Sequence, residues 1–83
     1  AARALKEQVL EARRRLLGAE HPDTTIAAWN YWLTLRAAGE QEAAARVFEE
    51  CLRWLVERDP ATLGVDQRKI RVMVADALRT FRG

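Results

Sequence analysis

The chain has 83 residues, of which 49% are hydrophobic, so it is long enough for one small domain and too apolar for a disordered segment. Its net charge of +2 indicates no strong attraction to nucleic acid, and its single cysteine, Cys51, excludes an intrachain disulfide and a cysteine-based zinc site. No apolar run reaches the ~20 residues of a membrane helix, and the N-terminus has no signal-peptide core. We therefore expect a soluble, cytoplasmic protein with no cofactor and no membrane contact.

Four helices are predicted, at 2–17, 22–38, 41–58 and 65–82. Gly18 ends the first, because glycine readily adopts a left-handed backbone. Pro22 suits the first turn of the second, where its missing N–H would be unpaired anyway, and Asp23 favours the positive end of that helix dipole. Apolar residues recur along the first helix at the spacing of one helix face: Leu5, Val9, Leu10, Ala12, Leu16 and Leu17.

The third and fourth helices each have an apolar face as well. These faces consist of Ala44, Val47, Phe48, Cys51, Leu52 and Leu55 in the third helix, and Ile70, Val74, Ala77, Leu78 and Phe81 in the fourth. Asp59-Pro60 ends the third helix, since proline disfavours helical geometry in the residue before it. Because short connections force neighbouring helices to pack antiparallel, we predict an all-α fold of about four antiparallel helices.

The two halves of the chain repeat one another. A shift of 42 positions lays residues 5–10 over residues 47–52, and a shift of 43 positions lays Asp23 over Asp66 and Leu35 over Leu78. The first and third helices are therefore one kind of element, and the second and fourth are the other. Periods of this length are typical of helical-repeat proteins.

A set of residues in this pattern resembles the tetratricopeptide repeat, in its long kinesin-light-chain-like variety: Leu17, Gly18, His21, Pro22, Asp23, Thr24, Asn30, Gly39, Ala44 and Phe48. The resemblance implies an α-solenoid fragment of a larger multidomain protein, with the second helix of one repeat (2–17), a full repeat (22–58) and a further or capping helix (65–82). The chain departs from the family at Trp32, where the family prefers glycine or alanine, and in the second connection, which lacks His-Pro. A ring at position 32 should push the helices of the repeat apart or turn toward an adjacent surface.

The resemblance also implies a binding surface, because the first helix of each repeat in this family lines a concave groove. Trp29 would anchor a ligand, since tryptophan buries much area at little entropy cost, and the Asn30 amide would hold ligand backbone. Arg36, Lys69 and Arg79 would favour an acidic ligand. The full set predicted to face this peptide-binding groove is Ile26, Trp29, Asn30, Leu33, Arg36, Lys69, Val72, Met73, Asp76 and Arg79.

These residues also have plainer interpretations. Trp29 would pack against a neighbouring helix, and Asn30 and the arginines would be solvated. His21, the only histidine, has a connecting role in this view rather than a catalytic or metal-binding one. Cys51 packs in the core.

The leading hypothesis is a protein-interaction module that binds a peptide or helix in the groove. The alternative is self-association into a homo-oligomer or larger assembly through exposed repeat end faces, with Trp32 and Trp54 as interface residues. A weaker alternative is a basic helical nucleic-acid binder, which would use Arg13-Arg14-Arg15 or the positive charges of the fourth helix. Since the chain has no serine, no glycine-rich phosphate loop and no nucleophile elbow, we predict no catalytic residue and no enzyme activity.

Overall fold

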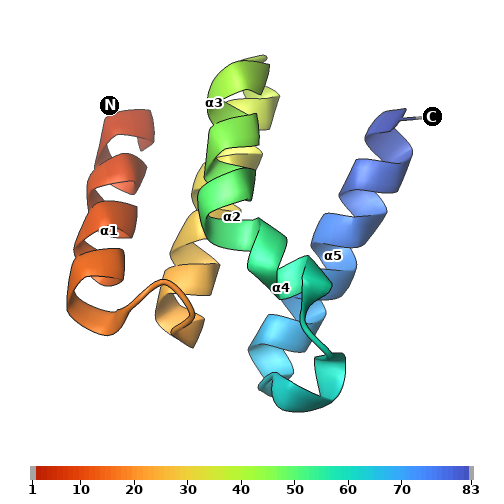
Figure 1. Cartoon of the computed structure of the whole chain (residues 1–83). Coiled ribbons are helices and arrows are strands. Elements are labelled where there is room, and N and C mark those ends of the chain that lie inside the picture. The colour runs from red at the N-terminus through yellow and green to blue at the C-terminus, as the bar shows by residue number, and fades with distance from the viewer. Residues whose placement is uncertain (1, 83) are drawn as a thin grey trace.

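A computed structural model describes the backbone of residues 2–82 and the side chains of residues 4–79. Its elements in chain order are α1 (Ala2–Leu17), α2 (Pro22–Ala37), α3 (Gln41–Val47), the π-helical turn η1 (Phe48–Leu52), α4 (Arg53–Glu57), the 3-10 turn η2 (Pro60–Thr62) and α5 (Val65–Arg82) (Figure 1). Since α3, η1 and α4 follow one another without a break, they form the predicted third helix. The prediction of an all-α fold with four antiparallel helices is confirmed.

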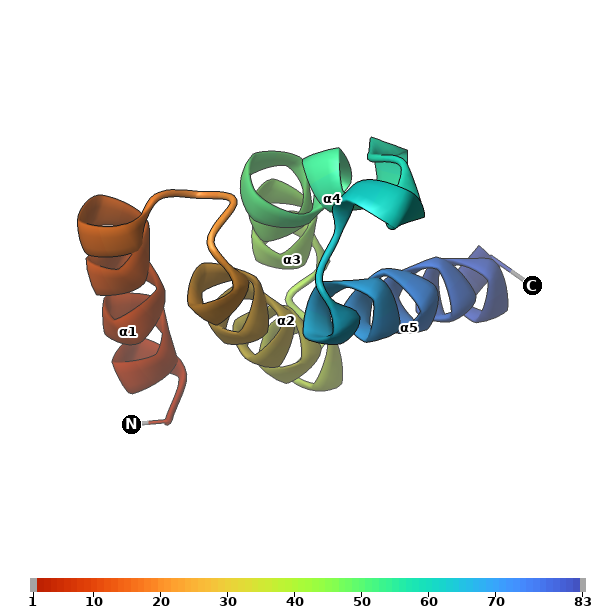
Figure 2. The same cartoon turned by 90° about the horizontal axis from the view of Figure 1, so that it is seen from below.

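The central element is α2, which contacts α1, α3, η1 and α5. Figure 2 shows α1 on one side of α2 and α5 on the other, with α3 and α4 packed above them. Toward its C-terminus α5 extends away from the other helices (Figures 1 and 2). This divergence leaves space between α5 and α3.

The core draws mainly on α2 and the third helix. It consists of Leu10, Ala28, Tyr31, Trp32, Leu35, Ala44, Cys51, Leu52, Leu55, Leu63, Ile70 and Val74. The predicted apolar faces of the third helix and α5 are confirmed for their described side chains, with Val47, Phe48, Ala77 and Leu78 partly buried against this core. Phe81, predicted on the same face of α5, lies outside the described side chains.

Only part of the predicted apolar stripe of α1 is buried. Leu10 is 4% exposed and belongs to the core, whereas Leu5 is 63% exposed and Leu16 is 80% exposed. The reason is geometric, because α1 packs mainly on α2 and no described element covers its outer side. The face that the sequence marks as apolar therefore lies mostly in solvent.

His21 caps the N-terminus of α2. Its Nδ1 accepts a hydrogen bond from the Asp23 backbone N–H at 3.1 Å, and its carbonyl oxygen accepts one from Thr25 Oγ1 at 3.2 Å. Pro22 occupies the first helical position, where no N–H is required. The predicted connecting role of His21 is thus confirmed.

Gly39 ends α2 in a left-handed conformation, with φ of 76°. The Gly39 N–H donates to the Arg36 carbonyl at 3.1 Å, and the Glu40 N–H donates to the Leu35 carbonyl at 2.9 Å. This pair of hydrogen bonds is the Schellman motif, which satisfies the last carbonyls of a helix. A side chain at position 39 would meet no atom within 4 Å, so only the backbone geometry demands glycine there.

Gly39→Ala should therefore lower the free energy of unfolding by about 1–2 kcal/mol, since an L-residue pays this cost in the left-handed region. In thermal unfolding this corresponds to a loss of roughly 4–8 °C per kcal/mol for a domain of this size. Gly64→Ala is the matched control, because Gly64 has no positive φ and also faces open space. Equal melting temperatures for the two variants would contradict the assigned turn geometry.

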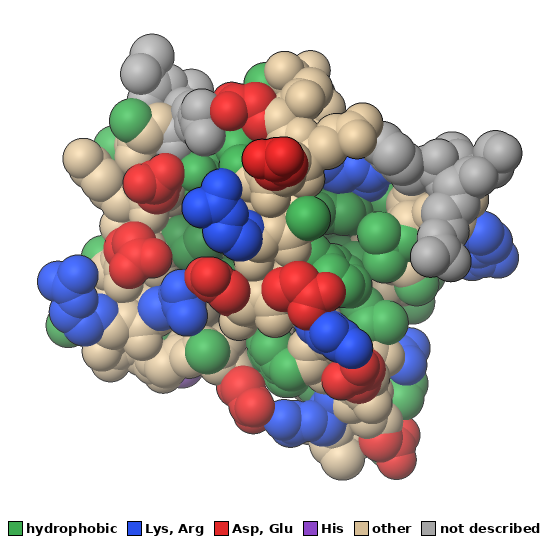
Figure 3. Space-filling model, turned by 45° about the horizontal axis from the view of Figure 1, so that its top comes forward, with side chains coloured by type: hydrophobic (Ala, Val, Ile, Leu, Met, Phe, Trp, Pro, Cys, Tyr) green, Lys and Arg blue, Asp and Glu red, His purple; other side chains and the backbone are tan. Residues whose placement is uncertain are grey.

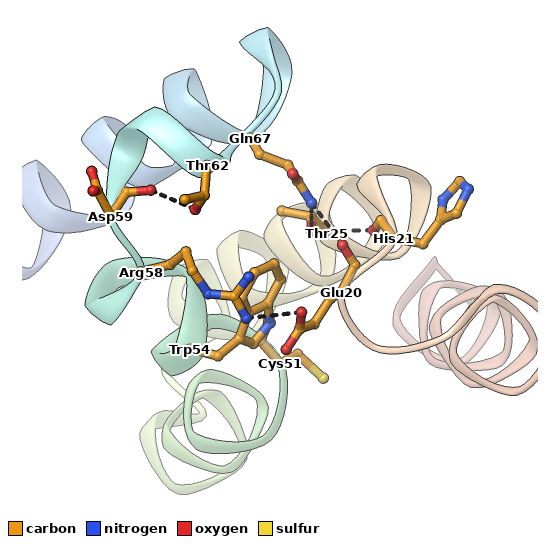
Figure 4. A network of polar contacts seen from close by, with 9 residues as sticks. All are labelled: Glu20, His21, Thr25, Cys51, Trp54, Arg58, Asp59, Thr62 and Gln67. Carbon is orange, nitrogen blue, oxygen red and sulfur yellow. Dashed lines mark hydrogen bonds and ion pairs between the residues drawn. The ribbon is translucent and has the colours of Figure 1, made fainter.

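A polar network ties the first connection to α4 and α5 (Figure 4). Gln67 of α5 is 6% exposed, and its Nε2 donates to the Glu20 carbonyl at 2.8 Å and to Thr25 Oγ1 at 3.2 Å. The Glu20 carboxylate forms an ion pair with Arg58 at 2.8 Å, and the Arg58 guanidinium lies 5.1 Å from the centre of the Trp54 ring. These contacts hold together segments that are far apart in the sequence.

Candidate functional site

An open hollow of about 270 Å³ lies where α5 diverges from α3, and we name it the Trp32 hollow. Its lining comes from the end of α2, from α3 and η1, and from the second half of α5: Trp32, Arg36, Gln41, Ala44, Ala45, Phe48, Glu49 and Leu78. Figure 3 shows hydrophobic side chains gathered between the central helices and α5 on this side of the molecule. The hollow is therefore an apolar surface in contact with solvent.

An aromatic cluster lies at the Trp32 hollow, and two of its rings, Trp32 and Phe48, line the hollow. The Trp32 ring centre lies 5.5 Å from that of Trp29 and 6.4 Å from that of Phe48, in tilted arrangements. Such tilted pairs are favourable for aromatic rings. Ala44 and Ala45 of α3 also line the hollow, and their short side chains leave room beside these rings.

Trp32 is 2% exposed, and its ring packs between α2 and η1 against the ring of Phe48. Its predicted role at an exposed interface for self-association is therefore wrong, because so little of the ring reaches the surface. Trp54, the other residue predicted there, is half-buried; its Nε1 donates to the Cys51 carbonyl at 2.8 Å, and Arg58 lies over its ring. The self-association hypothesis consequently loses one of its two interface residues.

Polar groups surround these apolar side chains. The Arg36 guanidinium lies 4.6 Å from the centre of the Trp32 ring, which is cation–π geometry. Glu49 is held by Arg53 at 2.7 Å, one turn further along the third helix. An apolar centre with a polar rim is the usual anatomy of a protein interface.

The residues predicted to face a groove do not share one site. Arg36 lines the Trp32 hollow, whereas Ile26 and Asn30 line a separate hollow of about 230 Å³ between α1 and α2. We name the latter the α1–α2 hollow; its other lining residues are Val9, Arg13, Asp23 and Ala27.

Trp29 is half-buried beside Trp32, which agrees more closely with a packing residue than with a fully exposed anchor. Leu33 on α2 and Met73 on α5 are 40% and 43% exposed. The α5 residues Lys69, Val72, Asp76 and Arg79 are also exposed, and Asp76 pairs with Arg79 at 3.6 Å.

The sequence interpretation missed Gln41, Ala45, Glu49 and Leu78 as site residues. They meet at the Trp32 hollow because α5 diverges from α3, and no residue spacing encodes the angle between two helices. The unusual Trp32 was the available signal, since a large ring where the family has a small residue predicts altered helix packing.

Cys51 lies at a third, more polar hollow between α1 and the third helix, near Glu7, Arg14 and Tyr31. Tyr31 Oη donates to Glu7 Oε2 at 2.8 Å across it. Burial raises the pKa of the Cys51 thiol above its ordinary value of 9.0, and the positive charge of Arg14 only partly opposes this shift. The thiol is thus kept protonated at neutral pH, which is the opposite of what an activated nucleophile requires.

The described part of the chain holds neither a metal-binding cluster nor a membrane-spanning helix. Within it, no group of three or more His, Cys, Asp or Glu side chains could hold a metal ion. No helix there is long and apolar enough to cross a bilayer.

The described helices define the class of fold as an all-α domain of four helices in antiparallel packing. Comparison of the chain with protein-family models, with curated proteins and with solved structures found no match. The resemblance to the tetratricopeptide repeat therefore depends on the residues of the chain alone.

Proposed function

We propose that this chain is a protein-interaction module that binds a peptide or helix of a partner protein at the Trp32 hollow. The observation that carries the proposal is a hollow open to solvent, with Ala45, Phe48 and Leu78 at its surface above the buried Trp32 ring and with polar side chains at its border. Hot spots of interfaces are typically single large side chains that enter such a hollow, while a polar rim excludes water around them. Binding therefore requires no chemical step from the protein.

One inserted side chain supplies most of the affinity in this proposal. Full burial of a leucine, methionine or phenylalanine contributes about 1.5–3 kcal/mol. The Arg36 guanidinium lies over the Trp32 ring, so this side chain forms part of the wall around the inserted side chain. The preferred ligand is therefore a segment that presents one large apolar side chain.

We further propose that the helices are a piece of a tetratricopeptide-type array, of the kinesin-light-chain-like variety. Three contacts support this: α1 packs on α2, α4 packs on α5, and α2 lies beside α5. The sequence shift of 42–43 positions lays the first helix over the third and the second over the fourth, and the contact between α1 and α2 thereby corresponds to the contact between α4 and α5. The binding proposal does not depend on this assignment, since it rests on the hollow itself.

Binding of nucleic acid is disfavoured by the small net charge of +2 and by ion pairs that offset Arg14 and Arg79, two of the cations named for it. Arg14 pairs with Glu11 and Glu50, and Arg53 pairs with Glu49. Phosphate contacts need clustered cations whose charge is not already offset.

The test is a selection of random displayed peptides on the wild-type chain, followed by affinity measurements on two variants. Ala45→Arg places a long charged side chain in the Trp32 hollow at an exposed position, so it should weaken the selected peptides at least tenfold, or about 1.4 kcal/mol. Ala61→Arg is the matched control, because it adds the same charge at an exposed residue of η2 and should leave affinity unchanged. Wild-type affinity in the Ala45→Arg variant would reject the proposed site.

A further inference from the structure

A second apolar surface lies on the outer side of α1. Leu5, Val9, Ala12 and Leu16 follow one another at spacings of four, three and four residues, so they form one stripe along the helix, which we name the α1 stripe. All four are exposed, and Leu16 is the most exposed large hydrophobic residue of the described chain, at 80%. The stripe is about 16 Å long at 1.5 Å per residue.

The α1 stripe continues into the α1–α2 hollow. Val9 belongs to both, and the hollow adds Ile26, which is 37% exposed, and the amide of Asn30. Val9 is the one residue of the stripe that lines the hollow, so the two surfaces adjoin there. A helix packed along the stripe covers its apolar side chains and reaches the adjoining hollow with the side chains of its flank.

The charges beside the stripe indicate which helix would bind. Arg13 and Arg15 lie on either side of the Leu16 end of the stripe, and both are exposed. Neither forms an ion pair or hydrogen bond with another described residue, in contrast to Arg14, which pairs with Glu11 and Glu50. Asp23 is the one acidic residue that lines the hollow, so two positive charges and one negative charge leave this surface net positive.

We infer that the α1 stripe and the α1–α2 hollow together bind an amphipathic helix of a partner protein that carries acidic residues beside its apolar face. The apolar face covers Leu5, Val9 and Leu16, and the acidic residues meet Arg13 and Arg15. The stripe alone would also suit a second copy of this chain. An antiparallel pair of α1 helices, however, would bring the Lys6 and Arg13 side of one copy against the same side of the other, and like charges disfavour that pairing.

The experiment uses two synthetic helical peptides with the same leucine stripe, one with glutamate and one with lysine at the flanking positions. The glutamate peptide should bind the wild-type chain about two- to thirtyfold more tightly than the lysine peptide, as expected for two exposed ion pairs. Leu16→Gln should weaken the glutamate peptide at least tenfold. Its unfolding transition should stay unchanged, because Leu16 is exposed.

A second part of the experiment reverses the charges at Arg13 and Arg15. In the double variant Arg13→Glu and Arg15→Glu, the preference should switch to the lysine peptide. Ala45→Arg, which blocks the Trp32 hollow, should leave binding of the glutamate peptide unchanged, so this inference and the proposed function fail separately. The inference is overturned if neither peptide binds, if both bind equally, or if sedimentation shows a dimer that Leu16→Gln converts to monomer.

Discussion

Replacement of Leu35 by alanine should lower the free energy of unfolding by about 2–5 kcal/mol. Leu35 is 0% exposed and lies on α2, the helix that contacts α1, the third helix and α5. An 83-residue domain has a total stability of roughly 4–12 kcal/mol, so this single change would remove much of it. Urea unfolding followed by circular dichroism measures the loss.

Leu33→Ala is the control for this variant. It removes the same atoms two positions earlier on α2, but Leu33 is 40% exposed and leaves no closed cavity when truncated. Its effect should be at most about 1 kcal/mol, since part of the side chain is already in water. A larger loss for Leu33→Ala than for Leu35→Ala would mean that α2 turns its other face to the core.

Gln67→Met should lower the free energy of unfolding by about 1–3 kcal/mol. The substitution keeps the shape of a buried side chain but removes the donor to the Glu20 carbonyl, at 2.8 Å. Amide hydrogen exchange should also rise in the connection between α1 and α2, because Gln67 holds it against α5.

Gln8→Met is the matched control, because Gln8 is exposed on α1 and should change stability by less than about 0.5 kcal/mol. If the two methionine variants were equally stable, the network of Figure 4 would have no stabilising role.

The helices could be predicted from the sequence because their signals are local. Apolar spacing, Gly18, Gly39 and the two prolines mark their positions and ends, and the observed boundaries agree within a residue or two. The π-helical turn at Phe48–Leu52, which contacts α2, had no such signal in the spacing of residues. Whether an apolar face is buried also depends on its neighbours, and this is why the Leu5 and Leu16 face of α1 remains in solvent.

The candidate site could be predicted only in part. Arg36, Ile26 and Asn30 were predicted to face one concave groove, whereas Arg36 lines the Trp32 hollow and the other two line the α1–α2 hollow. Trp29 is drawn inward by the ring of Trp32, a contact between successive turns whose strength the sequence pattern does not give. The separation of the hollows follows from helix angles, which are set by packing of the whole domain.

The most direct measurement of the central claim is methyl NMR of the chain with a peptide selected on the wild type. On binding, the methyl signals of Ala45 and Leu78 should shift and should show contacts with an apolar side chain of the peptide. Ala61 and Leu63, in and after η2, should not respond. Shifts confined to Ala61 and Leu63, with Ala45 and Leu78 unmoved, would contradict binding at the Trp32 hollow.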